Sequence, residues 1–302
     1  MAKSSFLHKL CKRVAYGVAI RPLGAEDQPF RVKYPSPLKW YADPFVCSEG
    51  KNTYVFVELL HSYHVDGEIA VARVEQGRIG KFRTVIREPF HMSFPNVFQW
   101  QGAWYMLPET CQSGQLRLYR ARRFPYDWEL SGVLLEGREL VDHALYPTED
   151  GFFILTYDQT EPQDSRNRIF HLHMDSGRLE EIFPLGNWCR ERPGGTFYRA
   201  GEKWRHVVQE CRQGVYGEYL HVFEVEHFDR ERFEEREIRQ VHMQDLEVSP
   251  DNGRLQYLHT YNRNGDYEVI DVRYDKIYPD KFFIHQWEEI RKRLKKKGRR
   301  KM

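Results

Sequence analysis

Five polar residues stand at the start of five similar segments, each rich in apolar and aromatic residues. They are Asp43, Asn96, Asp142, Arg192 and Asp245. Carboxylates and a guanidinium offer many directional hydrogen bonds to hydroxyl groups, and an arginine can also clamp a carboxylate or phosphate with two bonds. If the fold brings these positions together, the sequence predicts a binding site for a polyol such as a sugar. The alternatives are aspartates buried in turns and an arginine that bridges neighbouring elements.

Glu109 is a further candidate, because it ends a segment that contains Trp and Tyr residues. Aromatic neighbours would desolvate its carboxyl group and raise the pKa, as a general acid requires. Inverting cleavage of a glycosidic bond uses one carboxylate to activate water and one carboxylic acid to protonate the leaving oxygen, about 6.5–9.5 Å apart. Asp43 and Glu109 are the candidate base and acid. Glu58 holds nearly the same place one segment earlier, so the two glutamates are alternatively equivalent structural residues.

The elements that must position these groups form a repeat. Glycines that fit hairpin turns occur at regular intervals of about fifty residues, at positions 50, 102, 151, 201 and 253. With the strand-like runs between them, the spacing indicates about four short strands per repeat, which is typical of a β-propeller blade. We predict an all-β, five-bladed β-propeller whose first strands line a central channel. The alternative is a β-sandwich with coincidental turn spacing.

Helical periodicity is confined to the two ends of the chain. Near the start, Phe6, Leu10, Val14 and Val18 recur on one helical face, and Phe283, Trp287 and Ile290 do so near the end. We therefore expect three regions. They are a basic amphipathic leader at 1–28, the propeller at 29–277, and an amphipathic helix with a polybasic tail at 278–302.

The charges are distributed unevenly. The 302 residues include 46 Lys and Arg against 44 Asp and Glu, yet residues 291–302 hold nine of the basic residues and no acidic one. The remainder is acidic, with 37 basic and 44 acidic residues. An amphipathic basic helix favours an anionic membrane interface, whereas an acidic body disfavours a specific nucleic-acid partner. The alternative for the tail is a solvated, disordered segment.

Composition and cysteine usage limit the remaining classes. An aromatic fraction of 15% and a charged fraction of 30% exclude a collagenous or disordered chain. No apolar run reaches the roughly 18 residues of a membrane-spanning helix, and no secretory cleavage site follows the apolar patch at 14–20. Five widely spaced cysteines fit reduced thiols. We expect a cytoplasmic protein, with peripheral attachment to the cytoplasmic face of a membrane as a further hypothesis.

A family resemblance enters with residues 40–46, WYADPFV, which resemble the first-blade motif of family 43 and family 32 glycoside hydrolases. In those enzymes an Asp before Pro at the start of the innermost strand is the base or nucleophile, which implies that role for Asp43. Family 43 enzymes usually carry a second Asp before Pro in blade two. This chain has Phe94 there, so the hydrolase triad is not reproduced.

Seven further motifs in order, among them RPGG (192–195), VVQEC (207–211) and HTYN (259–262), resemble a narrower relative. This relative is the N-terminal domain family of glucosamine inositolphosphorylceramide transferase, and the likeness covers about 38–275. In longer members of that family a separate glycosyltransferase domain follows. Gln209 and Glu210 resemble a polar pair of the family. His259 is a candidate to bind sugar hydroxyls or a central ion, the alternative being a satisfied core histidine.

The sequence thus predicts a carbohydrate-active propeller that acts on or binds a glycan or glycoconjugate, in surface polysaccharide or glycolipid biosynthesis. Trp40 is expected to offer a stacking face for a sugar, beside the polar residues named above. Glycosyl transfer and phosphorolysis are open alternatives, as is a non-catalytic module that supports a partner glycosyltransferase. No cluster at metal-ligand spacing and no phosphate-binding glycine loop is found, so we expect no metal and no cofactor.

Overall fold

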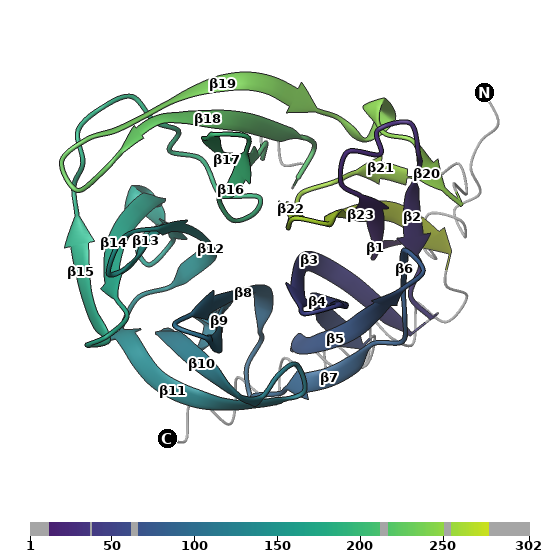
Figure 1. The fold of residues 1–302 in the computed structure, drawn as a ribbon, viewed down its shortest axis with the longest axis horizontal. Helices are drawn as coiled ribbons and strands as arrows, with labels where there is room; N and C mark the ends of the chain where they lie inside the picture. The colour runs from purple at the N-terminus through teal and green to yellow at the C-terminus, as the bar shows by residue number, and fades with distance from the viewer. Residues whose placement is uncertain (1–11, 37, 62–65, 212–216, 251–254, 278–302) are drawn as a thin grey trace.

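The computed structural model describes residues 12–36, 38–61, 66–211, 217–250 and 255–277. These residues form five β-sheets around a common centre, as Figure 1 shows, and the predicted five-bladed β-propeller is confirmed. The predicted C-terminal helix and basic tail lie outside the described residues. Within the described part, no helix combines the length and apolar character needed to cross a membrane.

Blades one to four are antiparallel sheets built from consecutive strands, with the first strand innermost. Blade one contains β3 (Lys39–Glu49), β4 (Asn52–His61) and β5 (Glu68–Glu75), with β6 (Arg78–Ile79) and β7 (Arg83–Ile86) both paired to β5. Blade two contains β8 (Ser93–Trp100), β9 (Ala103–Glu109), β10 (Gln115–Arg123) and β11 (Asp127–Glu136). Blade three contains β12 (Leu140–Pro147), β13 (Gly151–Asp158), β14 (Arg166–His173) and β15 (Arg178–Ile182). Blade four contains β16 (Tyr198–Ala200), β17 (Lys203–Gln209), β18 (Leu220–Phe228) and β19 (Phe233–Val241).

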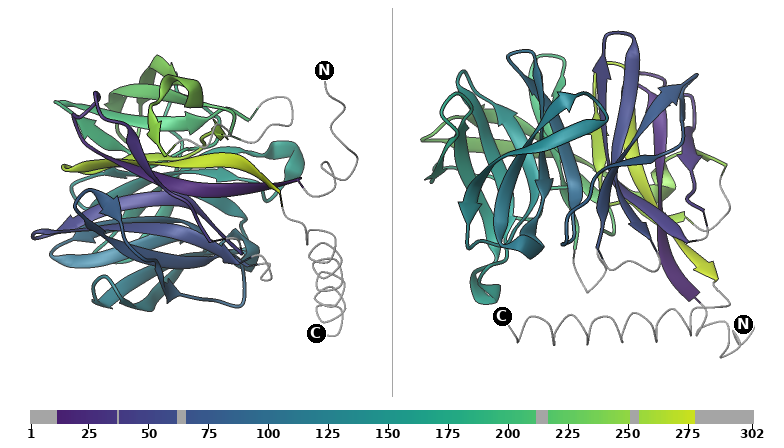
Figure 2. Two further views of the ribbon diagram at one scale, coloured as in Figure 1. Left: turned by 90° about the vertical axis from the view of Figure 1, so that its right-hand side faces the viewer. Right: turned by 90° about the horizontal axis from the view of Figure 1, so that it is seen from below.

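Blade five joins the two ends of the described chain. Its strands run outward from β22 (Tyr261–Arg263) through β23 (Tyr267–Ile277) and β1 (Lys12–Pro22) to β2 (Phe30–Lys33). Strands β1 and β23 pair along their full lengths and run side by side in Figure 2. Two short strands complete the sheet, β20 (Val248–Ser249) beside β2 and β21 (Leu255–Tyr257) beside β23. The described ranges also contain the short helices η1 (Cys111–Ser113), η2 (Pro162–Asp164) and η4 (Met243–Asp245).

Strand β1 corrects the predicted leader, because residues 12–22 belong to the propeller and are not helical. Val14 and Val18 are four residues apart, and this even spacing also puts them on one face of a strand. Residues 15–20 are all buried, because β1 lies inside its blade with neighbouring blades on both faces. The sequence of such a strand is a continuous apolar run, and periodicity alone cannot distinguish this run from a buried helix.

The fifth repeat is also corrected. The turns at Gly50, Gly102, Gly151 and Gly201 each lie between the two innermost strands of a blade, as predicted. Gly253 lies outside the described residues, and the strands that flank it pair elsewhere, β20 with β2 and β21 with β23. Asp245, predicted for the channel, instead ends η4, where its carboxylate accepts a hydrogen bond from the His242 N–H.

The core consists of five apolar clusters, one between each pair of adjacent blades. The cluster between blades one and two, for example, joins Phe45 and Phe56 to Phe94 and Met106. Both faces of an inner strand are therefore buried, which explains the dense apolar composition of the strands.

Near the centre, hydrogen bonds cross every boundary between blades, and five of them close a ring. The bonds run from Phe94 N–H to Asp43 Oδ2 (3.2 Å), Asn96 Nδ2 to His143 O (2.7 Å), Leu145 N–H to Thr196 Oγ1 (3.0 Å), Thr196 N–H to Asn262 Oδ1 (2.8 Å) and Asn262 Nδ2 to Pro44 O (3.0 Å). The ring fixes the inner strands relative to one another.

Candidate functional site

The inner strands of blades one, two and three contain a β-bulge at the same place. Each bulge holds a non-glycine residue with left-handed φ, namely Asp43 (50°), Phe94 (46°) and Asp142 (51°). Such conformations cost about 1–3 kcal/mol each and concentrate at functional sites, where bulges redirect side chains. Phe94 is thus the counterpart of Asp43 in blade two, so the departure from the hydrolase pattern holds in three dimensions.

Asp43 is buried and accepts hydrogen bonds through both carboxylate oxygens. Thr260 Oγ1 donates to Oδ1 at 2.9 Å, and the Phe94 N–H donates to Oδ2. His259 Nε2 lies 3.2 Å from Oδ1. Burial by itself raises the pKa of Asp43, but the hydrogen bond and positive charge of His259, with the other two donors, lower it below the usual value. Asp43 is therefore held as a carboxylate.

His259 lies between two carboxylates. Its Nδ1 atom is 2.6 Å from Oδ2 of Asp271, and Oδ1 of Asp271 accepts the backbone N–H groups of His259 and Thr260. Burial by itself lowers the pKa of His259, but the negative charges of Asp271 and Asp43 raise it well above the usual value. The three side chains form a buried relay in which Asp271 orients an imidazolium against Asp43.

Glu58 and Glu109 occupy equivalent positions, because Glu58 pairs with Ala42 beside the bulge of blade one and Glu109 pairs with Ser93 beside that of blade two. Both are buried. Burial and the nearby charge of Asp142 raise the pKa of Glu109 to about 8, although Arg192 opposes the shift. Burial and the charges of Asp43 and Glu109 also raise the pKa of Glu58 well above the usual value. Glu109 is therefore held protonated at neutral pH, and the pKa of Glu58 is shifted in the same direction.

Arg192 connects blade four to blades two and three. Its Nε donates to Oδ2 of Asp142, and its Nη2 lies 3.7 Å from Oε2 of Glu109. Gln209 donates to the same Asp142 oxygen at 2.9 Å and to Pro193 O at 2.7 Å. Burial raises the pKa of Asp142, and the Arg192 charge offsets this only in part. Asp43, Glu109, Asp142, Arg192 and Gln209 are thus parts of one electrostatic cluster.

The glycine pair of the RPGG motif has a steric role. A Cβ atom on Gly195 would lie 2.1 Å from Tyr261 O, and one on Gly194 would lie 2.9 Å from His259 O. Only glycine allows this approach of blade four to blade five. The pair therefore holds the segment that follows Arg192 against residues 259–261 of blade five.

Two other predicted residues lie close to the cluster. Trp40 is half-buried and packs edge-on against Tyr16, whose ring also contacts His259. Asn96 is buried, and its side-chain amide donates to the His143 carbonyl in the ring of inter-blade bonds. We assign Asn96 an architectural role in place of the predicted contact with substrate.

Glu210 belongs to a separate polar group. Its Oε2 atom accepts the Tyr219 hydroxyl at 3.3 Å and lies 3.1 Å from His221 Nε2. His221 in turn bonds Glu237 through Nδ1 at 2.8 Å. The neighbouring Gln209 is the member of the predicted pair that reaches Asp142.

Three contributors to the cluster escaped the sequence analysis. Asp271 and Thr260 hold His259 and Asp43, and His91 Nε2 lies 3.4 Å from Glu58 Oε1 while its Nδ1 accepts the Gly67 N–H. Thr260 lies next to His259 inside the HTYN motif, so this motif was a signal that could have identified it. Asp271 lies on β23, and the antiparallel pairing of β22 with β23 places it against His259 and Thr260.

The fold also assembles two groups whose ligand-type atoms lie within 4.8 Å of one another, although the sequence predicted no metal cluster. One is Asp43, His259 and Asp271, and the other is Asp150, His171 and His173 on blade three. In the second group, Arg230 faces His171 Nδ1 and Arg178 faces His173 Nε2. Because arginine only donates, the imidazole protons point toward Asp150, as in a hydrogen-bonded network.

One buried cluster at the centre thus contains carboxyl groups in two different protonation states. Asp43 is ionised, whereas Glu109 retains its proton. Pairs of carboxyl groups whose environments push their pKa values apart are suited to base and acid roles.

The fold and this cluster define a class, the five-bladed propellers with carboxyl groups at the inner ends of their blades. Within it, the family model described as "Glucosamine inositolphosphorylceramide transferase 1, N-terminal" matches residues 22–257, and the chain belongs to that family.

Similar proteins include glucosamine inositolphosphorylceramide transferase 1 of Arabidopsis thaliana, which is 29% identical over 218 residues. That match covers 67% of this chain and 28% of the relative. The Oryza sativa subsp. indica protein of the same name is 28% identical over 215 residues, covering 66% and 28%. The matched part of this chain therefore spans less than a third of the length of these relatives.

Solved structures with a similar fold include the GH43_1 enzyme of Xanthomonas citri complexed with xylotriose, with a TM-score of 0.53 and 11% identity, covering 80% of this chain and 88% of that one. The native arabinanase Arb43A of Bacillus subtilis has a TM-score of 0.51 and 10% identity, covering 83% and 96%. At these identities the likeness defines the fold.

Proposed function

We propose that this propeller acts on a glycan or glycoconjugate by glycosidic-bond chemistry at the central cluster. The observation that carries the proposal is the opposite protonation of Asp43 and Glu109, which share one buried cluster. Asp43 would accept a proton from the attacking water, and Glu109 would give its proton to the leaving oxygen. The names of the full-length relatives favour a glycolipid or related surface glycan as the substrate class.

Each neighbour has a defined part in this scheme. His259, oriented by Asp271, keeps Asp43 ionised, so Asp271 is a positioning residue. Arg192 fixes Asp142 next to Glu109 and presents a guanidinium edge to sugar hydroxyls. Trp40 supplies an aromatic face beside His259 through Tyr16.

Asp43→Asn and Glu109→Gln test the proposal, in a screen of sugar nucleotides and glycoconjugates by mass spectrometry. We expect each substitution to reduce turnover at least about a hundredfold, the typical contribution of a general acid or base, with ligand binding retained. Asp150→Asn is the matched control, since Asp150 also pairs with histidine but lies on blade three. Unchanged turnover in Asp43→Asn would refute the assignment.

A second function, a non-catalytic glycan-binding module for a partner glycosyltransferase, is favoured by a specific observation. Phe94 replaces the second acidic residue and is fully buried, so the hydrolase constellation is incomplete. The screen separates the two functions, because a binding module would retain glycans without converting them, and pull-down with a glycosyltransferase would depend on the bound glycan.

We further propose peripheral attachment at the cytoplasmic face of a membrane through residues 283–302, which lie outside the described part of the chain. The support is the charge of 291–302 and the free thiols of Cys47, Cys111, Cys189 and Cys211. Replacing the basic residues of 291–302 by Gln in the full chain should abolish co-sedimentation with anionic vesicles. Equal binding by the variant would contradict the attachment.

A further inference from the structure

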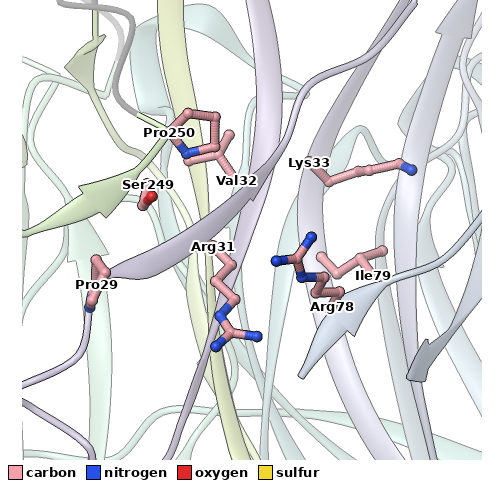
Figure 3. A pocket seen from close by; sticks show the side chains of 8 residues that line it. All are labelled: Pro29, Arg31, Val32, Lys33, Arg78, Ile79, Ser249 and Pro250. Carbon is pink, nitrogen blue, oxygen red and sulfur yellow. The ribbon is translucent and has the colours of Figure 1, made fainter. Parts of the chain in front are cut away.

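A basic pocket lies outside the central cluster, at the outer junction between blades five and one. It has a volume of about 480 Å³ and is lined by Pro29, Arg31, Val32, Lys33, Arg78, Ile79, Ser249 and Pro250. Figure 3 shows Arg31 on β2 and Arg78 on β6 extending into this space, with Lys33 at its edge. The volume is in the range of small-molecule sites.

The two arginines are positioned by a tight turn. Gln76 and Gly77 connect β5 to β6 with φ values of 50° and 67°, as a two-residue type I′ hairpin requires. This turn places Arg78 at the start of β6, and the Gln76 carbonyl accepts a hydrogen bond from Arg31 Nη1 at 3.2 Å. Guanidinium groups from two blades are thus fixed on one pocket.

Among the described residues that line the pocket, no acidic side chain balances the positive charges. Elsewhere the arginines of this acidic body are commonly paired with carboxylates, as in Arg21–Glu268, Arg138–Asp158 and Arg205–Glu224. Within the described ranges, neither Arg31 nor Arg78 has a carboxylate at ion-pair distance, and no acidic residue lines the pocket. Glu75 lines only the adjoining hollow on the other side of Arg78. Two guanidinium groups without counter-charge in a concave site favour an oxyanion.

We propose that this pocket binds the phosphate group of a phosphorylated small molecule or lipid headgroup. The guanidinium groups of Arg31 and Arg78 would hold the phosphate oxygens, and Lys33 would add to the positive potential. The organic part of the ester would rest on the apolar atoms of Pro29, Val32, Ile79 and Pro250. The site is independent of the proposed glycosidic-bond chemistry in the channel.

The test compares the full wild-type chain with the double variant Arg31→Gln/Arg78→Gln by calorimetric titration with inorganic pyrophosphate. Charge-assisted hydrogen bonds from guanidinium groups to phosphate are strong, so we expect binding at least about tenfold weaker in the variant. Arg120→Gln/Arg123→Gln is the matched control, with the same loss of charge at two exposed arginines of blade two. It should bind within about twofold of the wild type.

Two arms distinguish the source of the phosphate. Titration with glycerol phosphate tests a free ester, and co-sedimentation with phosphatidylcholine vesicles containing phosphatidic acid tests a lipid headgroup. All variants keep residues 291–302, so a difference between the two double variants isolates the pocket. Dependence on Arg31 and Arg78 in either arm supports the proposal. The proposal is overturned if the wild type shows no saturable binding, or if both double variants lose binding equally. If the double variant does not fold, the single variant Arg78→Gln replaces it in the same comparison.

Discussion

Two groups of similar composition lie in opposite surroundings within the described part of the protein. One is Asp43, His259 and Asp271 at the centre, and the other is Asp150, His171 and His173 on blade three. At the centre, the side chain of Asp271 is completely buried, and those of Asp43 and His259 are 8% and 7% exposed. On blade three, Asp150 is 51% exposed and contacts His171 and His173. The central pair of carboxylates raises the pKa of His259 well above its usual value, whereas burial lowers that of His171 despite Asp150. The same residue types therefore form an ionic relay only where water is excluded and two carboxylates face one imidazole.

Removal of Asp271 should break the central relay with the largest effect. Asp271→Asn leaves His259 with one charged partner in a buried site, and loss of one partner of a buried ion pair costs about 3–5 kcal/mol. We expect that decrease in the free energy of unfolding by urea denaturation, together with a lower pKa of His259 in an NMR titration. A cost below about 1 kcal/mol would show that the relay is not an ionic one.

Glu109 should make stability depend on pH, with an effect of comparable size. Its pKa is about 8 in the folded protein, above the roughly 4.3 of an unfolded chain. Its contribution is therefore complete below about pH 4.3 and is lost as the pH rises through 8. At about 1.4 kcal/mol per pKa unit, this contribution amounts to a few kcal/mol.

Denaturation of the wild type and of Glu109→Gln between pH 5 and 9 measures the contribution of Glu109 to stability. Gln cannot titrate but has nearly the same shape as Glu. The stability of the wild type should fall relative to the variant across this window. Parallel pH profiles would mean that Glu109 is ionised in the folded protein and is unsuited to act as an acid.

Local patterns in the sequence were sufficient for the blade repeat, because each of four turn glycines joins two strands that pair within the same blade. The same patterns placed Asp43, Asp142 and Arg192, which stand at repeat starts and converge once the blades surround one centre. The closure of the propeller, in contrast, could not be predicted from local patterns. Strand β1 pairs with β23, about 250 residues later, and this pairing completes the fifth blade. In the absence of a local signal for that pairing, the fifth polar position was assigned to Asp245 instead of His259.

Asp150→Asn sharpens the comparison from the exposed side and should have the smallest effect. Hydrogen bonds from His173, Thr148 and His171 outweigh partial desolvation and lower the pKa of Asp150 to about 2. The resulting stability is present above the unfolded pKa of about 3.9 and is lost as the pH falls through 2. Because water screens this half-exposed carboxylate, we expect a loss of less than about 1 kcal/mol at neutral pH, which disappears near pH 2. A loss as large as that of Asp271→Asn would show that the composition of the group, and not its burial, sets its energy.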